Sequence, residues 1–184
     1  MADDITYLPP SLDFIRIVEP RLFIDDLGYS LETSSDPGLD ALRLGLRFAQ
    51  ERLEHNRCGA IRGLHYQLKA PQAKLFRVVT GAIFFVAVDL RRSSPEFGLA
   101  TCLELTDESR QAAWAPEGYA CGYMSLVEDT KVLIKASVLD EPLQKRTLLW
   151  NDPEISIKWP EGVDAHVSRH DAAGQPLHFV EPYD

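Results

Sequence analysis

The sequence predicts an all-β protein, a jelly roll with few short helices. Short segments with strand-like composition recur along the 184 residues and are separated by Gly, Pro, Asp and Ser. The run 81–89 is almost continuously apolar, which is typical of a central strand covered on both faces. A helical pattern is confined to 37–44, with a stretch near 51–55 or the C-terminal tail as further candidates.

The predicted strands follow one another with short connections. They are 13–18, 21–25, 28–33, 45–52, 58–67, 74–80, 82–90, 98–106, 110–115, 119–127, 130–138 and 146–150. Turn-forming residues separate them at 36–38, 81, 93–95, 116–118 and 128–129. If 119–126 and 131–138 form a hairpin, Tyr123 lies opposite Ile134, and Cys121 lies opposite Ala136.

One domain is expected over residues 1–184, because this length suits a single core and no repeat or linker interrupts it. Within it, 1–33 are expected to form N-terminal strands and 160–184 a C-terminal tail.

The composition restricts the classes of function and the cellular location that can be expected. A net charge of −9 argues against general nucleic-acid binding, although a local basic pocket for a phosphorylated ligand remains compatible with it. The three cysteines have neither disulfide-scaffold nor zinc-site spacing, so reduced thiols in the cytoplasm are expected. No leader is recognised and no apolar run approaches the about 20 residues that span a bilayer, so neither secretion nor membrane insertion is expected.

Ionisable side chains gather in two neighbouring strand segments that are otherwise apolar. Residues 62–67 read Arg-Gly-Leu-His-Tyr-Gln, and residues 74–79 read Lys-Leu-Phe-Arg-Val-Val. A short turn at 69–72 lets His65 and Lys74 converge. A base beside cations is a coherent set for proton abstraction next to a group that becomes anionic. The alternative is a structural, hydrogen-bonded histidine.

No metal or other cofactor is predicted. The five histidines include no His-x-His pair and lack the spacing that gathers three ligands on one pair of strands.

In these and further stretches the chain resembles the dTDP-4-dehydrorhamnose 3,5-epimerases. The matching stretches, in the family's order, are 62–67, 74–77, 86–91, 94–98, 114–118 and 150–153. The resemblance implies a cupin-like double-stranded β-helix. It also implies a cofactor-independent isomerase that epimerises a nucleotide-linked 4-keto-6-deoxy sugar by proton abstraction next to the ketone.

The resemblance also implies roles for individual residues. His65 is the base, Asp171 orients it, and Lys74 faces the developing enolate. Arg62, Glu32 and Gln50 fall on positions that bind the nucleotide sugar. A homodimer is implied as well, with the strand-like region 12–33 joining the partner's sheet.

The departures from the family pattern concern the same site. The family's catalytic tyrosine, in a Tyr-Lys-Thr-Thr segment, is replaced by Ile134, and a binding histidine by Cys121. An Asp-x-Arg-Gly segment reads Asp-Asp-Leu-Gly at 25–28, and a central aspartate is Phe85. The nucleotide and sugar are therefore left open.

We interpret Tyr123, through its hydroxyl, as the replacement proton donor, with the Cys121 thiol as the weaker candidate; a packing role for Tyr123 is the alternative. Three hypotheses for function remain open. They are an epimerase acting on one or two centres, another nucleotide-sugar isomerase of the same fold, and a catalytically silent sugar-nucleotide binding protein.

Overall fold

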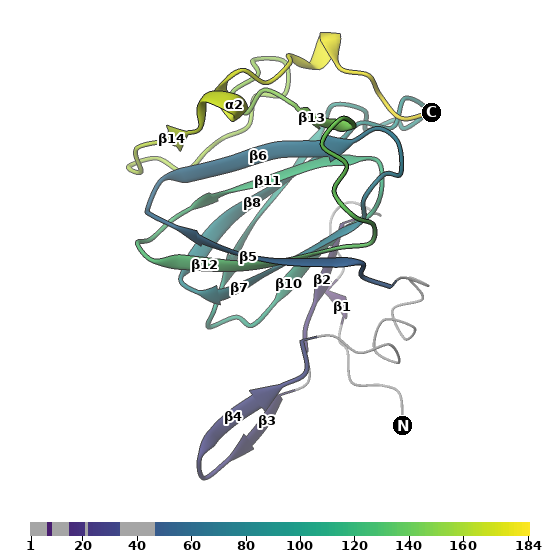
Figure 1. Cartoon of the computed structure of the whole chain (residues 1–184). Coiled ribbons are helices and arrows are strands. Elements are labelled where there is room, and N and C mark those ends of the chain that lie inside the picture. The colour runs from purple at the N-terminus through teal and green to yellow at the C-terminus, as the bar shows by residue number, and fades with distance from the viewer. Residues whose placement is uncertain (1–6, 9–14, 21, 34–46) are drawn as a thin grey trace.

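The computed structural model describes residues 7–8, 15–20, 22–33 and 47–184. The predicted helix at 37–44 lies outside them. The described chain is dominated by strands, and two facing sheets form its body (Figure 1).

Each sheet is built mainly from antiparallel strands that are distant in sequence. The first sheet has the order β1 (Tyr7–Leu8), β2 (Arg16–Val18), β10 (Ala112–Ala115), β7 (Lys74–Thr80), β12 (Thr130–Ala136), β5 (Gln50–Asn56). The second has the order β13 (Lys145–Thr147), β6 (Ala60–Gln67), β11 (Tyr119–Ser125), β8 (Ala82–Asp89), β9 (Ala100–Thr106). The two-residue strand β14 (His166–Val167) runs parallel to β6.

The side chains of β8 pack against different layers on its two faces. Phe85 and Ala87 belong to the core between the sheets, where Phe85 contacts Phe76 of β7 with ring centroids 4.9 Å apart. Val86 and Val88 belong to a second apolar cluster on the outer face of the second sheet. Because alternate residues of a strand point to opposite faces, both faces are apolar, and the prediction of a doubly covered central strand is confirmed.

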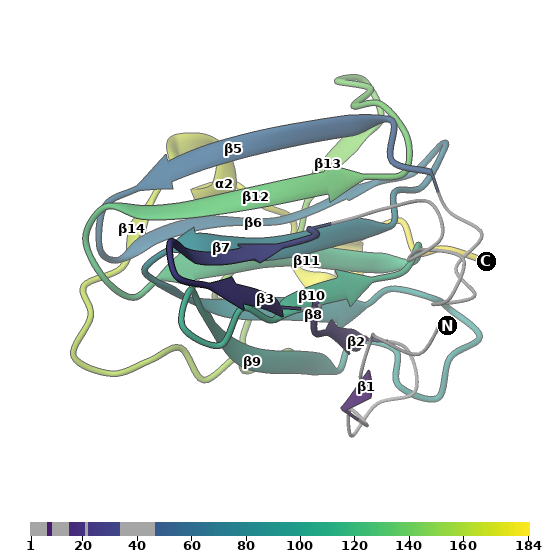
Figure 2. The same cartoon turned by 90° about the horizontal axis from the view of Figure 1, so that it is seen from below.

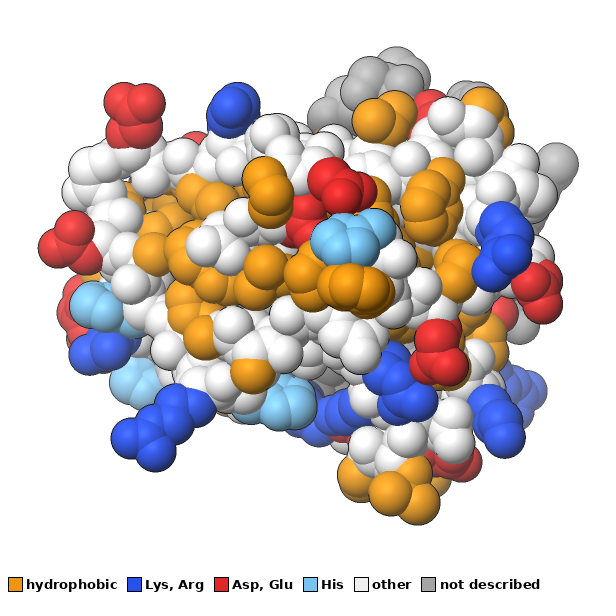
Figure 3. Space-filling model, turned by 90° about the horizontal axis from the view of Figure 1, so that it is seen from above, with side chains coloured by type: hydrophobic (Ala, Val, Ile, Leu, Met, Phe, Trp, Pro, Cys, Tyr) orange, Lys and Arg blue, Asp and Glu red, His pale blue; other side chains and the backbone are white. Residues whose placement is uncertain are grey.

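The C-terminal segment covers this outer face. It carries the short helices α2 (Arg169–Ala172) and η1 (Leu177–Phe179), in the tail where a helical pattern was predicted. Seen from this side, apolar side chains spread across the middle of the molecule and most charged ones lie toward the edges (Figure 3).

The predicted hairpin of 119–126 with 131–138 is wrong. Strand β11 pairs with β6 and β8, whereas β12 pairs with β5 and β7, so the four-residue connection 126–129 passes from one sheet to the other. Tyr123 therefore lies opposite Arg62 and Phe85. Ile134 lies opposite Arg52 and Phe76. A four-residue connection is compatible with either topology, so its length could not distinguish a hairpin from a crossing between the sheets.

The alternative of a helix near 51–55 is also wrong. Residues 50–56 form strand β5, which pairs with β12 along its whole length. Ladder hydrogen bonds to a neighbouring strand outweigh a weak local helical preference.

A small hairpin of β3 (Leu22–Asp25) and β4 (Gly28–Leu31) projects from the body of the molecule (Figure 1) and lies in front of the first sheet when seen from below (Figure 2). It exposes large apolar side chains, with Ile24 76% and Leu27 97% accessible. The described part of the chain contains no helix that is long and apolar enough to span a bilayer.

Candidate active site

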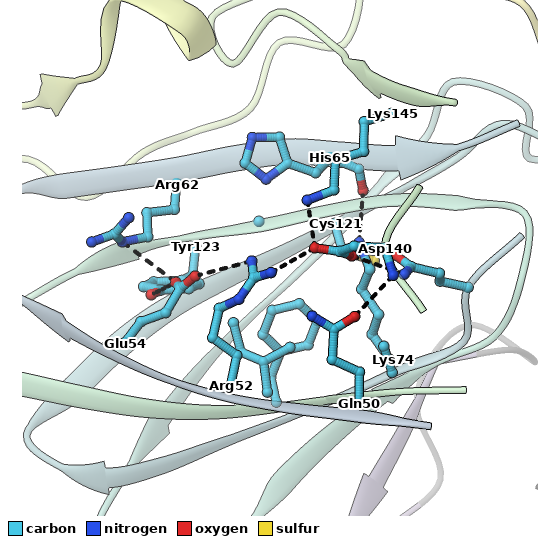
Figure 4. Close-up of a pocket in the computed structure, with 15 residues that line it drawn as sticks. Gln50, Arg52, Glu54, Arg62, His65, Lys74, Cys121, Tyr123, Asp140 and Lys145 are labelled. Atoms are coloured by element: carbon cyan, nitrogen blue, oxygen red, sulfur yellow. Dashed lines mark hydrogen bonds and ion pairs between the residues drawn. The ribbon is translucent and has the colours of Figure 1, made fainter. Parts of the chain in front are cut away.

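A pocket opens between the two sheets and holds about 570 Å³ of space, including the solvent at its mouth (Figure 4). Strands β5, β7 and β12 supply one wall, and β6 and β11 supply the other. The lining residues are Gln50, Arg52, Glu54, Arg62, His65, Gln72, Lys74, Phe76, Cys121, Gly122, Tyr123, Ile134, Ala136, Asp140 and Lys145.

His65 and Asp171 form a hydrogen-bonded pair at this pocket. The Nε2 atom of His65, on β6, lies 2.6 Å from Oδ1 of Asp171, on α2. The His65 side chain is 38% exposed and lines the pocket, whereas the Asp171 side chain is 7% exposed and lies behind it. The backbone N–H of Gly63 donates to the second carboxylate oxygen at 3.4 Å. The aspartate is thus held in place from two sides.

The surroundings of Asp171 favour its ionised form. Burial by itself raises the pKa of the carboxyl, but hydrogen bonds and charge interactions, those with His65 and Gly63 foremost, bring the pKa below its ordinary value. An ionised Asp171 accepts a hydrogen bond from Nε2–H, which leaves the lone pair of His65 on Nδ1. The imidazole can therefore accept a proton there, and its positive charge is then stabilised by the aspartate.

Lys74 reaches the pocket from the opposite sheet. Its Nζ donates to the backbone carbonyl oxygen of His65 at 3.3 Å, so cation and base are close together. Removal of its ammonium group from water lowers the pKa of Lys74, while Cys121 and Asp140 counteract this shift. A cation placed in a partly water-excluded pocket stabilises a negative charge more than the same cation in bulk water.

The Tyr123 hydroxyl crosses the pocket from the second sheet to the first. It donates to Oε2 of Glu54, on β5, at 2.6 Å and accepts from Nδ2 of Asn56 at 3.1 Å. Burial, followed by the charge and hydrogen bond of Glu54, raises the pKa of Tyr123 well above its ordinary value. The hydroxyl therefore keeps its proton at neutral pH.

Arg62 contacts Asn56 and Glu54, the two partners of the Tyr123 hydroxyl. Its Nε donates to Oδ1 of Asn56 at 2.5 Å and lies 3.4 Å from Oε2 of Glu54. Of the other predicted binding residues, Gln50 and Cys121 line the pocket, and burial raises the pKa of the Cys121 thiol to about 12. Glu32 follows β4 and does not line the pocket.

Comparison with known proteins reveals the family. The profile of the family described as dTDP-4-dehydrorhamnose 3,5-epimerase matches residues 11–178. The chain belongs to this family. A dTDP-4-dehydrorhamnose 3,5-epimerase of Methanothermobacter thermautotrophicus is 37% identical over 176 residues, which cover 95% of each chain.

Solved structures of similar epimerases have the same fold. The Legionella pneumophila dTDP-6-deoxy-D-glucose-3,5-epimerase, in complex with dTDP-4-keto-L-rhamnose, superposes with a TM-score of 0.93 at 30% identity, covering 98% of both chains. A 3'-monoepimerase of Streptomyces bikiniensis, in complex with dTDP-quinovose, gives a TM-score of 0.84 at 27% identity and covers 92% of this chain and 87% of its own. The predicted cupin-like jelly roll and epimerase family are confirmed.

Three residues that are expected from the sequence to depart from the family pattern lie in or next to the pocket. Ile134 lines the wall that faces His65, and Cys121 lies directly opposite His65 on the neighbouring strand. Phe85 is fully buried beneath the pocket against Phe76. Phe85 belongs to the apolar core between the sheets and Ile134 packs against it, so this side of the pocket is apolar.

Sequence reasoning missed several charged pocket residues. Arg52 and Glu54 follow Gln50 at alternate positions of β5, so all three face the pocket. That alternation is the signal that could have identified them, had 50–56 been recognised as one strand. Asp140, which lies between β12 and β13, has no such signal, because loop residues lack a regular period.

Gly122 lets β11 approach β6 beneath the pocket. A Cβ atom at this position would lie 2.4 Å from the Arg62 carbonyl oxygen and 3.1 Å from the Gly63 Cα. We expect Gly122→Ala to lower the free energy of unfolding by about 1–3 kcal/mol, because both contacts are with backbone that cannot rotate away. Urea denaturation measures this change, and an unaltered midpoint would contradict the close approach.

In 7–8, 15–20, 22–33 and 47–184, no three His, Cys, Asp or Glu residues are grouped so that they could hold a metal ion.

Proposed function

We propose that this protein epimerises a nucleotide-linked 4-keto-6-deoxy sugar by abstracting a proton from a carbon next to the ketone. The observation that carries the proposal is the His65–Asp171 pair, with a 2.6 Å hydrogen bond, beside Lys74 in the pocket. The Legionella relative, bound to dTDP-4-keto-L-rhamnose, supports the substrate class.

The reaction begins at His65. Its Nδ1 takes the proton from the carbon, the electron pair of the C–H bond moves into the new C=C bond, and the ketone oxygen becomes an enolate oxygen. Lys74 stabilises that oxygen, which is more negative in the transition state than in the ketone. Return of a proton to the opposite face of the carbon restores the ketone with inverted configuration.

Tyr123 is our proposed proton donor. Although β11 belongs to the same sheet as His65, the tyrosine hydroxyl reaches Glu54 on the facing sheet. An enolate is a strong enough base at carbon to take a proton from a phenol of raised pKa. Binding of the sugar has to turn the hydroxyl from Glu54 toward the carbon.

The Tyr123→Phe variant separates the two proton transfers. We expect its inversion rate to fall by about 10²-fold, the lower range for loss of a general acid, while His65-dependent deuterium exchange from D₂O continues. Product formation is followed by NMR together with the deuterium content of recovered substrate. An unchanged inversion rate excludes Tyr123, and the Cys121→Ser variant then tests the thiol.

Proton exchange also tests the function as a whole. The protein is incubated in D₂O with 4-keto-6-deoxy sugars linked to thymidine, cytidine or guanosine diphosphate, and carbon-bound deuterium is measured by NMR and mass spectrometry. Deuterium at one flanking carbon indicates a single-centre epimerase, as the name of the Streptomyces bikiniensis relative describes for that protein, and deuterium at both indicates a 3,5-epimerase. Exchange without inversion favours another isomerase. Binding without exchange favours a silent binding protein.

We further propose that the protein is a cytoplasmic homodimer. The apolar side chains exposed on the β3–β4 hairpin, among them Ile24 and Leu27, suit packing against a second copy, and Glu32 would reach the partner's pocket from there. Sedimentation should give twice the 20.7 kDa mass of one chain. A monomer at micromolar concentration would contradict this assembly.

A further inference from the structure

Two cations at one end of the pocket converge on a single oxygen atom. Arg52 Nη2 lies 2.5 Å and Lys145 Nζ lies 2.6 Å from Oδ2 of Asp140 (Figure 4). Arg52 comes from β5 in the first sheet, Lys145 from β13 in the second, and Asp140 from the loop between β12 and β13. Arg52 and Lys145 are therefore already placed to hold one anionic oxygen between the two sheets.

We propose that Arg52 and Lys145 bind the diphosphate of the substrate, and that a phosphate oxygen replaces Asp140 Oδ2 between them. Before the substrate binds, the Asp140 carboxylate occupies this position. The identity of the anion as a nucleoside diphosphate rests on the proposed function. The arrangement of the two cations does not.

The charge of the pocket supports an anionic ligand at this end. Among the described residues that line it, Arg52, Arg62, Lys74 and Lys145 are cationic and only Glu54 and Asp140 are carboxylates, although the whole chain has a net charge of −9. Acidic proteins that concentrate positive charge in a pocket attract anionic ligands there.

The remaining pocket cations have other partners. Arg62 is held by Asn56 and Glu54, and Lys74 donates to the carbonyl of His65. Arg52 lies 3.9 Å from Glu54, a longer contact than its 2.5 Å bond to Asp140.

Access from solvent suits the exchange. The side chains of Arg52 and Lys145 are 47% and 38% exposed, and that of Asp140 is 21% exposed. A guanidinium and an ammonium group that meet one oxygen can give a phosphate several charge-assisted hydrogen bonds, because each retains further N–H donors.

The Oδ2 atom of Asp140 can leave the two cations while the rest of the residue stays in place. Its other carboxylate oxygen accepts from Nε2 of Gln72 at 3.0 Å, and its backbone N–H donates to Oε1 of Gln50 at 2.9 Å. These two bonds hold the residue when Oδ2 leaves the cations. Hydrogen bonds from Lys145, Gln72 and Arg52 outweigh the effect of burial and hold the pKa of Asp140 far below its ordinary value, so its carboxylate competes with phosphate at all neutral pH values.

Binding measurements on single-charge variants test the proposal. Affinities for thymidine diphosphate, thymidine monophosphate and inorganic pyrophosphate are measured by calorimetry with the wild-type protein, Arg52→Gln, Lys145→Gln and Asp140→Asn. Arg146→Gln is the matched control, because Arg146 neighbours Lys145 in sequence but pairs with Glu181 and does not line the pocket. Thermal melts establish that each variant is folded.

We expect Arg52→Gln and Lys145→Gln each to weaken thymidine diphosphate and pyrophosphate binding by at least about tenfold, the effect of losing a charge-assisted hydrogen bond. Thymidine monophosphate should lose less. Asp140→Asn should bind both diphosphates more tightly, because the competing charge is gone, and Arg146→Gln should match the wild type. Salt should weaken diphosphate binding less in the two cation variants than in the wild type.

Wild-type affinity in both cation variants would overturn the subsite. Weaker binding by Asp140→Asn would overturn the exchange, since Asp140 would then serve as a fixed bracket for the cations. Should a cation variant fail to fold, the Asp140→Asn result decides. Diphosphate binding that depends on Arg52 and Lys145, in a protein without deuterium exchange, would support the subsite while contradicting the proposed catalysis.

Discussion

The His65→Asn variant should lose deuterium exchange and turnover by about 10²- to 10⁴-fold, the usual range for removal of a general base. Asparagine can replace the hydrogen bond to Asp171, but its amide cannot take a proton from carbon. The loss is expected in kcat, because nucleotide binding depends on other residues. The measurement is deuterium incorporation per unit time by NMR.

The surface offers a matched control for this variant. His178 Nδ1 lies 3.0 Å from Glu154 Oε1, and both side chains are 52% exposed, so this histidine–carboxylate pair resembles the pocket pair in chemistry but lies in solvent. His178→Asn should retain full exchange. The Asp171→Asn variant should lose about as much as His65→Asn, because an amide no longer fixes the Nε2–H tautomer. Exchange at the wild-type rate in His65→Asn would remove this residue from catalysis.

The Lys74→Met variant should lower kcat by about 10²- to 10³-fold, the range seen when one stabiliser of a developing oxyanion is lost. Methionine has a similar length and no charge, so the pocket stays filled while the enolate loses its cation. Lys74→Arg should recover part of the rate, because it restores the charge but not the position of the nitrogen. Initial rates over a range of substrate concentrations separate kcat from KM.

Lys135 supplies the control for Lys74. Its side chain is also largely buried, 13% exposed, and lies on β12 next to β7, but it pairs with Glu51 on the face directed away from the pocket. Lys135→Met should leave kcat within about twofold of the wild type, because Lys135 does not line the pocket. A Lys74→Met variant that changes KM alone would assign the lysine to binding and not to stabilisation of the enolate.

Local sequence patterns predicted the strands well because strand composition and turn residues act over a few positions. Apolar runs and their bounding turns located β6, β7 and β8 to within one or two residues of the structure. The assignment of β11 and β12 to separate sheets could not be obtained in this way. It depends on which surfaces are buried together, and a four-residue connection is the same in either case.

Some contacts of the site could be predicted from the sequence, and others could not. The short turn between β6 and β7 led to the prediction that His65 and Lys74 converge. In the structure, a 3.3 Å hydrogen bond joins Lys74 Nζ to the backbone carbonyl oxygen of His65. Asp171 lies 106 positions from His65, so only the family resemblance associated them. Neither local sequence patterns nor the family resemblance predicted the group of Arg52, Asp140 and Lys145. These residues come from a strand face, a loop and a short strand that only the fold brings together.

The groups proposed to handle protons and charge are divided between the two walls of the sandwich. His65 is carried by one sheet and Lys74 by the other, and Phe76 and Phe85 pack against each other in the core between these sheets. The distance between the base and the cation therefore depends on how the apolar core between the sheets is packed. A change in the volume of these two rings is therefore expected to shift base and cation relative to each other, although neither ring takes part in the chemistry.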